Sequence, residues 1–225
     1  MQIDFTAREL TIKLVYYGPA LSGKTTNLQA MHRLTAPGSC GRLMTLETRD
    51  DRTLFFDLLP LTFDVGGSVR VRLKVFTVPG QVMHNATRRL VLQGADGIAF
   101  IADSQKSETK ANQQAFLNMQ ENLRENSFDP ATTPLVIQFN KRDLPNVRTD
   151  AEIDALAARG KEPVFKAVAT RGVGVMETFF GLLDRTWALL DSTHELEKKF
   201  AINQERLMKE LHKQLRTPAG SEVHS

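Results

Sequence analysis

The sequence predicts an α/β fold. We expect a three-layer domain with a mostly parallel central sheet over residues 1–190, followed by a C-terminal helical extension with a frayed tail over 191–225. Three observations support this. Short apolar runs alternate with helix-like stretches, the segment "GPALSGKT" (18–25) follows one such run, and polar residues end several later runs. Strands that alternate with helices form parallel sheets that helices cover on both faces.

The strands are predicted from the apolar runs. Residues 11–17 form a β-rich run directly before the "GPALSGKT" segment, and 69–78 alternates Val and Leu with Arg and Lys, the period of a half-buried strand. Three further runs are short and apolar, at 97–103, 134–140 and 163–169. Helices are expected directly after the "GPALSGKT" segment and at 83–93, 109–126, 150–159 and 175–190.

A different pattern begins near residue 191. Ser192 and Glu195 form an S-x-x-E capping box, which predicts the start of an amphipathic helix over 194–216. Its polar face mixes Lys with Glu, so we expect the apolar stripe to pack on the chain's own domain or on a partner protein rather than on lipid. Six residues fall within about 120° of one helical face: Leu196, Phe200, Leu207, Met208, Leu211 and Leu215.

Composition excludes several classes of protein. The 225 residues are 24% charged and 41% hydrophobic with a net charge of +3, and no dense basic block suggests a nucleic-acid partner. The single cysteine, Cys40, rules out an internal disulfide and fits a reducing compartment. No secretory signal, lipidation motif or apolar stretch of about 18 residues suggests a membrane. A cytoplasmic location is therefore expected.

The segment 18–25 fits G-x-x-x-x-G-K-[ST], a phosphate-binding loop. Backbone N–H groups in such a loop point at phosphates, and the following helix N-terminus adds partial positive charge. Lys24 is expected to reach the outer phosphates, and the Thr25 hydroxyl to bind Mg²⁺. An ordinary glycine-rich turn would not explain why Lys and Thr follow Gly23. The candidate nucleotide-binding residues here are Gly18, Ala20, Leu21, Ser22, Gly23, Lys24, Thr25 and Thr26.

A second motif, "NKRD" (140–143), follows the apolar run 134–139. An Asp143 carboxylate can accept hydrogen bonds from guanine N1–H and from its exocyclic amino group, a donor pair that adenine lacks. The stem of Lys141 can lie over the ring, and the Ala169 N–H in "VAT" (168–170) can serve guanine O6. The candidate base-binding residues are Asn140, Lys141, Asp143, Ala169 and Thr170.

Taken together, these motifs resemble those of the Ras-like small GTPases, specifically the bacterial MglA type. The resemblance runs from about residue 8 to 190 and is carried by "YYGPALSGKTTNLQ" (16–29), "DDRTLFFDLLPL" (50–61), "TVPGQV" (77–82) and "NKRDLPN" (140–146). It implies a P-loop NTPase fold that binds GTP and GDP, hydrolyses GTP with Mg²⁺, and acts in cell polarity and gliding motility. It also implies a roadblock-type, MglB-like activating protein, usually dimeric, while the effectors are not identified.

The resemblance implies roles for single residues. Thr53 matches the first-switch threonine, which joins Thr25 at Mg²⁺, and Gly80 matches the glycine whose N–H senses the γ-phosphate. Gln81 matches the glutamine that orients the attacking water, and Arg52 an arginine supplied in cis. With Lys24, Gln81 and Arg52 form the expected catalytic set. For Arg52, which stands beside two aspartates, a solvated charge cluster is an equally good interpretation.

Two residues depart from the usual small-GTPase pattern. Thr77 occupies the slot of a carboxylate that holds Mg²⁺ through water, and Asp51 or Asp103 are candidates to compensate. Ala20 replaces a glycine, and its Cβ would face the space where Gln81 must act. Misplacing a catalytic group by about 1 Å can cost about a hundredfold in rate. We therefore expect slow GTP hydrolysis without an activator.

Two other functions are considered. A module that holds guanine nucleotide with little turnover would suit Ala20 and Thr77, whereas Gln81 and Arg52 argue against it. A P-loop ATPase or kinase is disfavoured by Asp143 and by the lack of a second acidic strand end for Mg²⁺.

Overall fold

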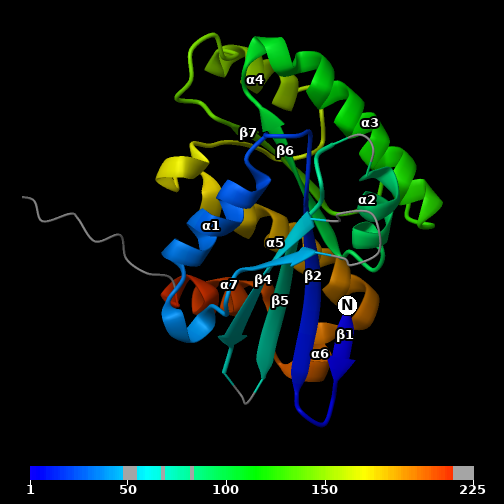
Figure 1. The fold of residues 1–225 in the computed structure, drawn as a ribbon. Helices are drawn as coiled ribbons and strands as arrows, with labels where there is room; N and C mark the ends of the chain where they lie inside the picture. The colour runs from blue at the N-terminus through cyan, green and yellow to red at the C-terminus, as the bar shows by residue number, and fades with distance from the viewer. Residues whose placement is uncertain (48–54, 67–68, 82–83, 215–225) are drawn as a thin grey trace, which may run out of the picture.

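The computed structural model describes residues 1–47, 55–66, 69–81 and 84–214. Within these residues it contains one eight-stranded sheet and seven α-helices (Figure 1). The arrangement in three layers around a mostly parallel sheet is the one predicted. The strands are β1 (Gln2–Asp4), β2 (Glu9–Tyr17), β3 (Met44–Glu47), β4 (Phe55–Asp64), β5 (Arg70–Thr77), β6 (Gly97–Asp103), β7 (Leu135–Asn140) and β8 (Val164–Lys166). The helices are α1 (Lys24–Leu34), α2 (Asn85–Leu92), α3 (Thr109–Glu125), α4 (Asp150–Ala157), α5 (Val175–His194), α6 (Leu196–Phe200) and α7 (Gln204–Lys213).

The strand order is β3-β4-β5-β2-β6-β7-β8, and β1 also pairs with β2. The run β5-β2-β6-β7-β8 is parallel, whereas β3-β4, β4-β5 and β1-β2 are antiparallel. All five predicted strands are present, although the predicted run 163–169 forms a strand only at Val164–Lys166. The sequence did not predict β1, β3 and β4.

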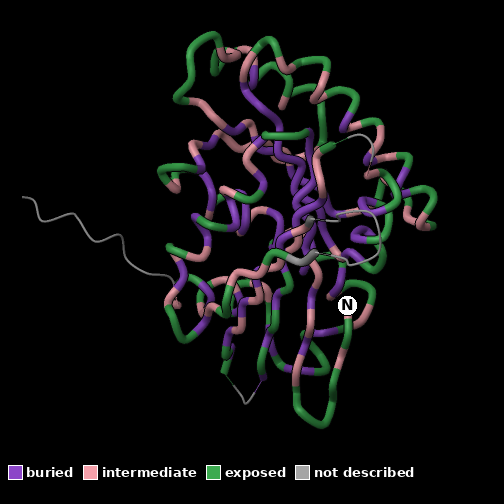
Figure 2. Tube along the Cα trace, viewed as in Figure 1, coloured by how far each residue is buried: buried purple, intermediate pink, exposed green. Residues whose placement is uncertain are grey.

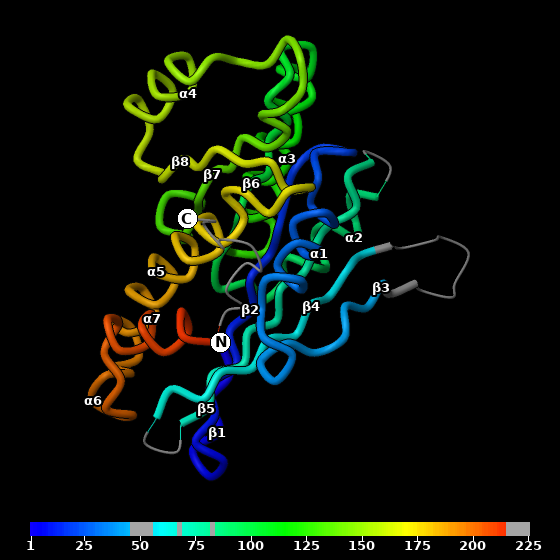
Figure 3. The backbone as a smooth tube through the Cα atoms, turned by 90° about the vertical axis from the view of Figure 1, so that its left-hand side faces the viewer, coloured from blue at the N-terminus to red at the C-terminus, as the bar shows by residue number. Residues whose placement is uncertain are grey.

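Two apolar cores lie on opposite faces of the sheet. One core joins residues of α1, α5, α6 and α7 to the sheet, with Trp187 and Phe179 among its largest fully buried side chains. The other joins α2 and α3 to the opposite face through residues such as Leu92 and Met119. Figures 1 and 3 show the helices arranged around the sheet, and Figure 2 shows that burial concentrates along the central strands.

The parallel pairing of β2, β5, β6 and β7 places the loops that follow these strands close together. Tyr16 of β2 pairs with Thr77 of β5, and Asp103 of β6 pairs with Asn140 of β7. The loops that leave these strands therefore meet at one edge of the sheet, where α1 begins (Figure 1). Ligands of open α/β sheets bind at the carboxyl ends of the strands.

The prediction of one helix over 194–216 is wrong. Helix α5 continues to His194, so Ser192 lies inside it and the S-x-x-E motif does not begin a helix. Glu195 and Ala201 adopt left-handed conformations, with φ of 53° and 57°, and these divide the segment into α6 and α7. The side chain that caps α7 is Asn203, which accepts a hydrogen bond from the Arg206 N–H at 2.9 Å.

The apolar stripe nevertheless packs on the chain's own domain. Leu196, Phe200, Leu207 and Leu211 are buried in the core that contains α1 and α5, and Met208 packs against it. The His212 ring stacks on an α5 ring, that of Phe180, with 3.8 Å between centroids. This confirms the expectation of packing on protein for the described part of the stripe. Leu215 lies outside the described residues, and the domain boundary near residue 190 remains a prediction.

The end of α7 is tied to two other parts of the molecule. The Gln214 carbonyl accepts a hydrogen bond from the Ala36 N–H at 3.1 Å, and its Nε2 donates to the Asp64 carbonyl at 3.2 Å. These bonds link the C-terminal helix to the segment after α1 and to the end of β4. Among the described residues, no helix has both the length and the apolar character that crossing a bilayer requires.

Candidate functional site

The phosphate loop is held tightly between two strand ends. Gly18 has φ of 145°, and a Cβ there would lie 2.2 Å from the Ile101 carbonyl oxygen of β6. Gly23 has φ of 95°, and a Cβ there would lie 2.1 Å from the Asn140 amide nitrogen. Only glycine fits such positions, so both glycines of the motif are required by the backbone path and by close neighbours. Ser22, between them, is fully buried, and its hydroxyl has no hydrogen-bond partner among the described residues.

Lys24 is the buried cation of this loop. Lys24 is only 7% exposed, and its Nζ donates hydrogen bonds to the carbonyl oxygens of Gly18 at 2.9 Å and Pro19 at 2.6 Å. The pKa of Lys24 is lowered to about 7, chiefly by burial and also by the positive charge of Arg88, while the negative charge of Asp57 acts in the opposite direction. An anion in the loop would favour the charged form of this lysine.

A buried carboxylate, Asp57 of β4, lies beside the loop. It is 6% exposed, and three hydroxyl groups donate to it: those of Thr25 at 2.6 Å, Thr45 at 2.9 Å and Thr77 at 3.0 Å. The Asp57 backbone N–H also donates to the Thr77 hydroxyl at 2.8 Å. The site therefore contains a carboxylate next to Thr77, supplied by the neighbouring strand.

The sequence did not single out Asp57. Of the two carboxylates considered as substitutes, Asp103 instead pairs with Lys141 at 2.6 Å, and Asp51 lies outside the described residues. The available signal was a lone aspartate within the apolar run "FFDLLPL" (55–61). A charged side chain buried in such a run needs a hydrogen-bond, ion-pair or metal partner nearby. Without β4 in the predicted fold, nothing connected that aspartate to the phosphate loop.

The turn after β5 rests on the phosphate loop. A Cβ built on Gly80 would lie 2.4 Å from the Ala20 Cα and 2.5 Å from the Ala20 nitrogen, so the two backbones are in contact. Gln81 is exposed, and with Ala20 and Gly80 it lines a cavity of about 400 Å³. The structure thus brings Ala20 and Gln81 to one space, as expected. The predicted roles of Arg52 and Thr53 fall on residues outside the described part of the chain.

A buried arginine of α2 lines the same cavity. Arg88 is 3% exposed, whereas the adjacent Arg89 faces solvent and pairs with Glu125. Helix α2 is held to α3 at its first residue, because the Asn85 Oδ1 accepts hydrogen bonds from the amides of Asn118 and Asn122, both at 2.9 Å. The sequence shows two adjacent arginines and cannot tell which one is buried, so Arg88 was missed.

Asn140 connects the "NKRD" segment to two other loops. Its Nδ2 donates to the Ser22 carbonyl at 2.9 Å, and its Oδ1 accepts from the Ala169 N–H at 3.0 Å. This second bond occupies the N–H that was assigned to guanine O6, so the expected role of Ala169 is not available in this structure. Thr170, the next residue, lines a small pocket together with Asn140 and Ala169.

The remaining base-binding candidates lie together. Lys141 has φ of 65°, and its Nζ is held by the buried carboxylate of Asp103, so its stem is fixed beside the pocket. Asp143 is exposed and lines a pocket of about 170 Å³. A second cavity, of about 510 Å³, lies over the phosphate loop next to Asp57 and Gly80. Leu21, Gly23 and Thr26 line both, so the two form one elongated site.

Comparison with known proteins identifies a close relative. The chain is 46% identical over 176 residues to the mutual gliding-motility protein MglA of Myxococcus xanthus (strain DK1622). The match covers 78% of this chain and 90% of that protein. No protein-family model matches the chain.

Proposed function

Because the chain belongs to the MglA family of small GTPases, we propose that it binds GTP and GDP with Mg²⁺ and hydrolyses GTP as a molecular switch. Its relative is named for gliding motility, and we extend to this chain a role in motility or cell polarity, in the cytoplasm. One observation carries the proposal. The cavity over the phosphate loop, which the buried Lys24 lines, shares three lining residues with the pocket that Asp143 lines.

In this proposal the phosphates occupy the larger cavity. Lys24 exchanges the carbonyls of Gly18 and Pro19 for phosphate oxygens, which stabilise its charged form. The buried Ser22 hydroxyl then gains a polar ligand within the loop. Guanine occupies the smaller pocket, where Asp143 accepts its two donors and Thr170 replaces Ala169 as the partner of O6.

The residues present suit Mg²⁺. This ion prefers oxygen ligands and is usually bound by one or two carboxylates together with substrate phosphates. Thr25 supplies a hydroxyl directly after Lys24, Asp57 supplies the carboxylate that Thr77 lacks, and Thr53 belongs to the proposed set from outside the described residues. The ion would neutralise charge on the phosphates during phosphoryl transfer.

Hydrolysis is assigned to the turn that rests on the phosphate loop. We assign Gln81 to orient the attacking water, the Gly80 N–H to sense the γ-phosphate, and Arg52 to supply positive charge in cis. The family resemblance adds a dimeric roadblock-type activator as partner. Gln81 and Ala20 line one cavity, which supports the idea that the Ala20 methyl group restrains turnover until such a partner rearranges the turn.

A second candidate, a guanine-nucleotide-holding module with little turnover, is favoured by the contact between Gly80 and Ala20. In the structure the Gly80 backbone packs directly against the phosphate loop at Ala20. Sensing of the γ-phosphate instead requires the Gly80 N–H to face the nucleotide. A module that retained this contact would bind nucleotide and leave it uncut.

Single-turnover hydrolysis of γ-labelled GTP separates the two functions. We expect wild-type protein to release phosphate slowly, and faster when a roadblock-domain protein is added, whereas Lys24→Ala should bind neither GTP nor GDP. Arg89→Ala, on the exposed face of α2, is the control for handling and folding. Wild-type protein that binds GTP but releases no phosphate with or without activator would favour the holding module.

A further inference from the structure

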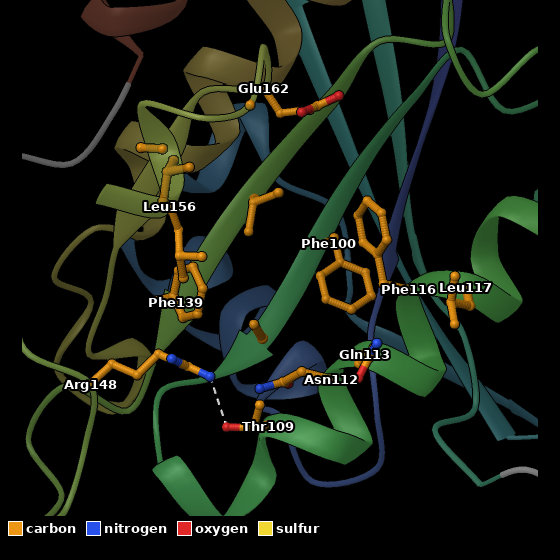
Figure 4. A pocket seen from close by; sticks show the side chains of 15 residues that line it. Phe100, Thr109, Asn112, Gln113, Phe116, Leu117, Phe139, Arg148, Leu156 and Glu162 are labelled. Carbon is orange, nitrogen blue, oxygen red and sulfur yellow. Dashed lines mark hydrogen bonds between the residues drawn. The ribbon is translucent and has the colours of Figure 1, made fainter. Parts of the chain in front are cut away.

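A separate pocket lies between α3 and α4 (Figure 4). Its volume is about 480 Å³, within the range of small-molecule sites. None of the described residues that line it lines the phosphate, base or Gln81 cavities. The nucleotide function therefore does not account for it.

The interior of this pocket is apolar. Phe100 of β6 and Phe116 of α3 meet edge to face, with 5.1 Å between ring centroids, and Phe139 of β7 forms another part of the wall (Figure 4). Phe100 is 3% exposed and Ala102 2%, so the pocket extends to the sheet itself. Such a surface favours an aliphatic chain, because transferring apolar area from water into an apolar pocket is favourable.

The pocket exists because α4 covers little of the sheet. Helix α4 has eight residues and buries one of them, Ile153. Leu156 of α4 and Leu117 of α3 remain 41% and 52% exposed, and both line the pocket (Figure 4). Large apolar side chains left open around an apolar hollow mark a surface that binds something.

One cation lies at one end of the pocket. The Arg148 guanidinium donates to the Thr109 hydroxyl at 2.8 Å, and no carboxylate among the described residues lies within ion-pair distance of it. Glu162 lies at the opposite end in Figure 4, where its carboxylate accepts from the Lys161 N–H at 3.3 Å. A half-buried arginine with only a neutral partner is suited to receive an anion, and guanidinium matches carboxylate geometry.

We propose that this pocket binds an aliphatic carboxylate, with the hydrocarbon chain against Phe100, Phe116 and Phe139 and the carboxylate on Arg148. Charge complementarity at Arg148 and the depth of the apolar wall select this ligand class over an apolar side chain of a partner protein, which would leave the arginine unpaired. The proposal is independent of nucleotide binding.

Calorimetric titration with decanoate, below its aggregation concentration, tests the proposal. We expect saturable binding to wild-type protein, at least tenfold weaker binding to Arg148→Met, and unchanged binding to Arg159→Met. Arg159 is an exposed arginine just beyond α4 that does not line the pocket. Ala157→Trp, which would fill the pocket from α4, should abolish binding, with thermal unfolding used to show that the variant is folded.

Uncharged and cationic probes of equal chain length test the head group. We expect decan-1-ol to bind wild-type and Arg148→Met protein equally, and more weakly than decanoate binds wild type. The absence of decanoate binding, or equal losses in the Arg148 and Arg159 variants, would overturn the proposal. Stronger binding of decylamine than of decanoate would also overturn it, since that would assign the head group to Glu162.

Discussion

Asp57 is the residue on which the proposed Mg²⁺ site depends. It lies on β4, a strand that runs antiparallel to β5, and faces Thr77 of that strand. The usual small-GTPase pattern has a carboxylate at the slot of Thr77, whereas here the carboxylate beside that slot is Asp57, on the neighbouring strand. The hydroxyls of Thr25, Thr45 and Thr77 donate hydrogen bonds to this carboxylate and fix its orientation.

Replacing Asp57 with Asn should weaken Mg²⁺ binding in the GDP complex by about 10- to 100-fold, the usual effect of losing a supporting carboxylate at a metal site. The amide keeps the size and one acceptor oxygen but removes the negative charge that attracts the ion. GDP release measured against free Mg²⁺ concentration checks this. Asp64→Asn, which alters the exposed carboxylate at the other end of β4, is the control. Identical Mg²⁺ dependence in the Asp57 variant and wild type would remove Asp57 from the metal site.

Ala20→Gly should raise the rate of GTP hydrolysis, most clearly with an activator present. The substitution removes the Cβ from the cavity that Gln81 lines and eases the contact with Gly80. Single-turnover rates at saturating GTP, together with GTP affinity, provide the measurement. An unchanged or lower rate at wild-type affinity would show that this loop already accommodates the methyl group.

At the level of residues, the sequence predicted the motifs and missed the residues that long-range pairing brings to them. The phosphate loop and the "NKRD" segment have fixed spacings, so their members can be assigned directly from the chain. Asp57 and Arg88 have no such spacing, and only the register of β4 and the packing of α2 bring them to the site. The occupied Ala169 N–H likewise depends on a side chain 29 residues away.

At the level of elements, the β4 strand and the C-terminal helices were the hardest to predict. Pro60 interrupts the run 55–64, and proline within a run argues against a strand. Here β3 pairs only as far as Leu58, so Pro60 lies beyond that pairing. The left-handed residues Glu195 and Ala201 divide the predicted C-terminal helix, and neither is the glycine or asparagine that usually signals such a turn.

Helix α7 is part of the core, so shortening its apolar side chains should destabilise the whole domain. Leu211 is fully buried, and Leu211→Ala should lower the free energy of unfolding by about 2–5 kcal/mol. Denaturant unfolding of the full chain checks this. Lys209→Ala, on the exposed face of the same helix, should change stability by no more than about 0.5 kcal/mol. Equal stability of both variants would mean that α7 does not dock on the domain in solution.

At the level of the whole molecule, the fold divides its two faces between different tasks. The face with α1, α5, α6 and α7 carries the larger set of buried residues. Apolar residues of β4, the strand that contains Asp57, pack in this core. The other face carries α2, whose buried Arg88 lines the same cavity as Gln81 and whose Asn85 accepts hydrogen bonds from α3. The nucleotide site lies at the strand ends between them, where either face can affect it.

Selectivity for guanine over adenine depends on the whole proposed site, because the phosphate loop alone does not distinguish the two bases. Competition between GTP and ATP for the Mg²⁺-loaded protein, in wild type and in Asp143→Ala, tests the account most directly. We expect wild-type protein to prefer GTP strongly, and Asp143→Ala to lose about 1.5–3 kcal/mol of GTP binding, the range for hydrogen bonds to a charged group, without losing ATP binding. Equal affinity of the wild-type protein for ATP and GTP would contradict the assignment of this site to a guanine nucleotide.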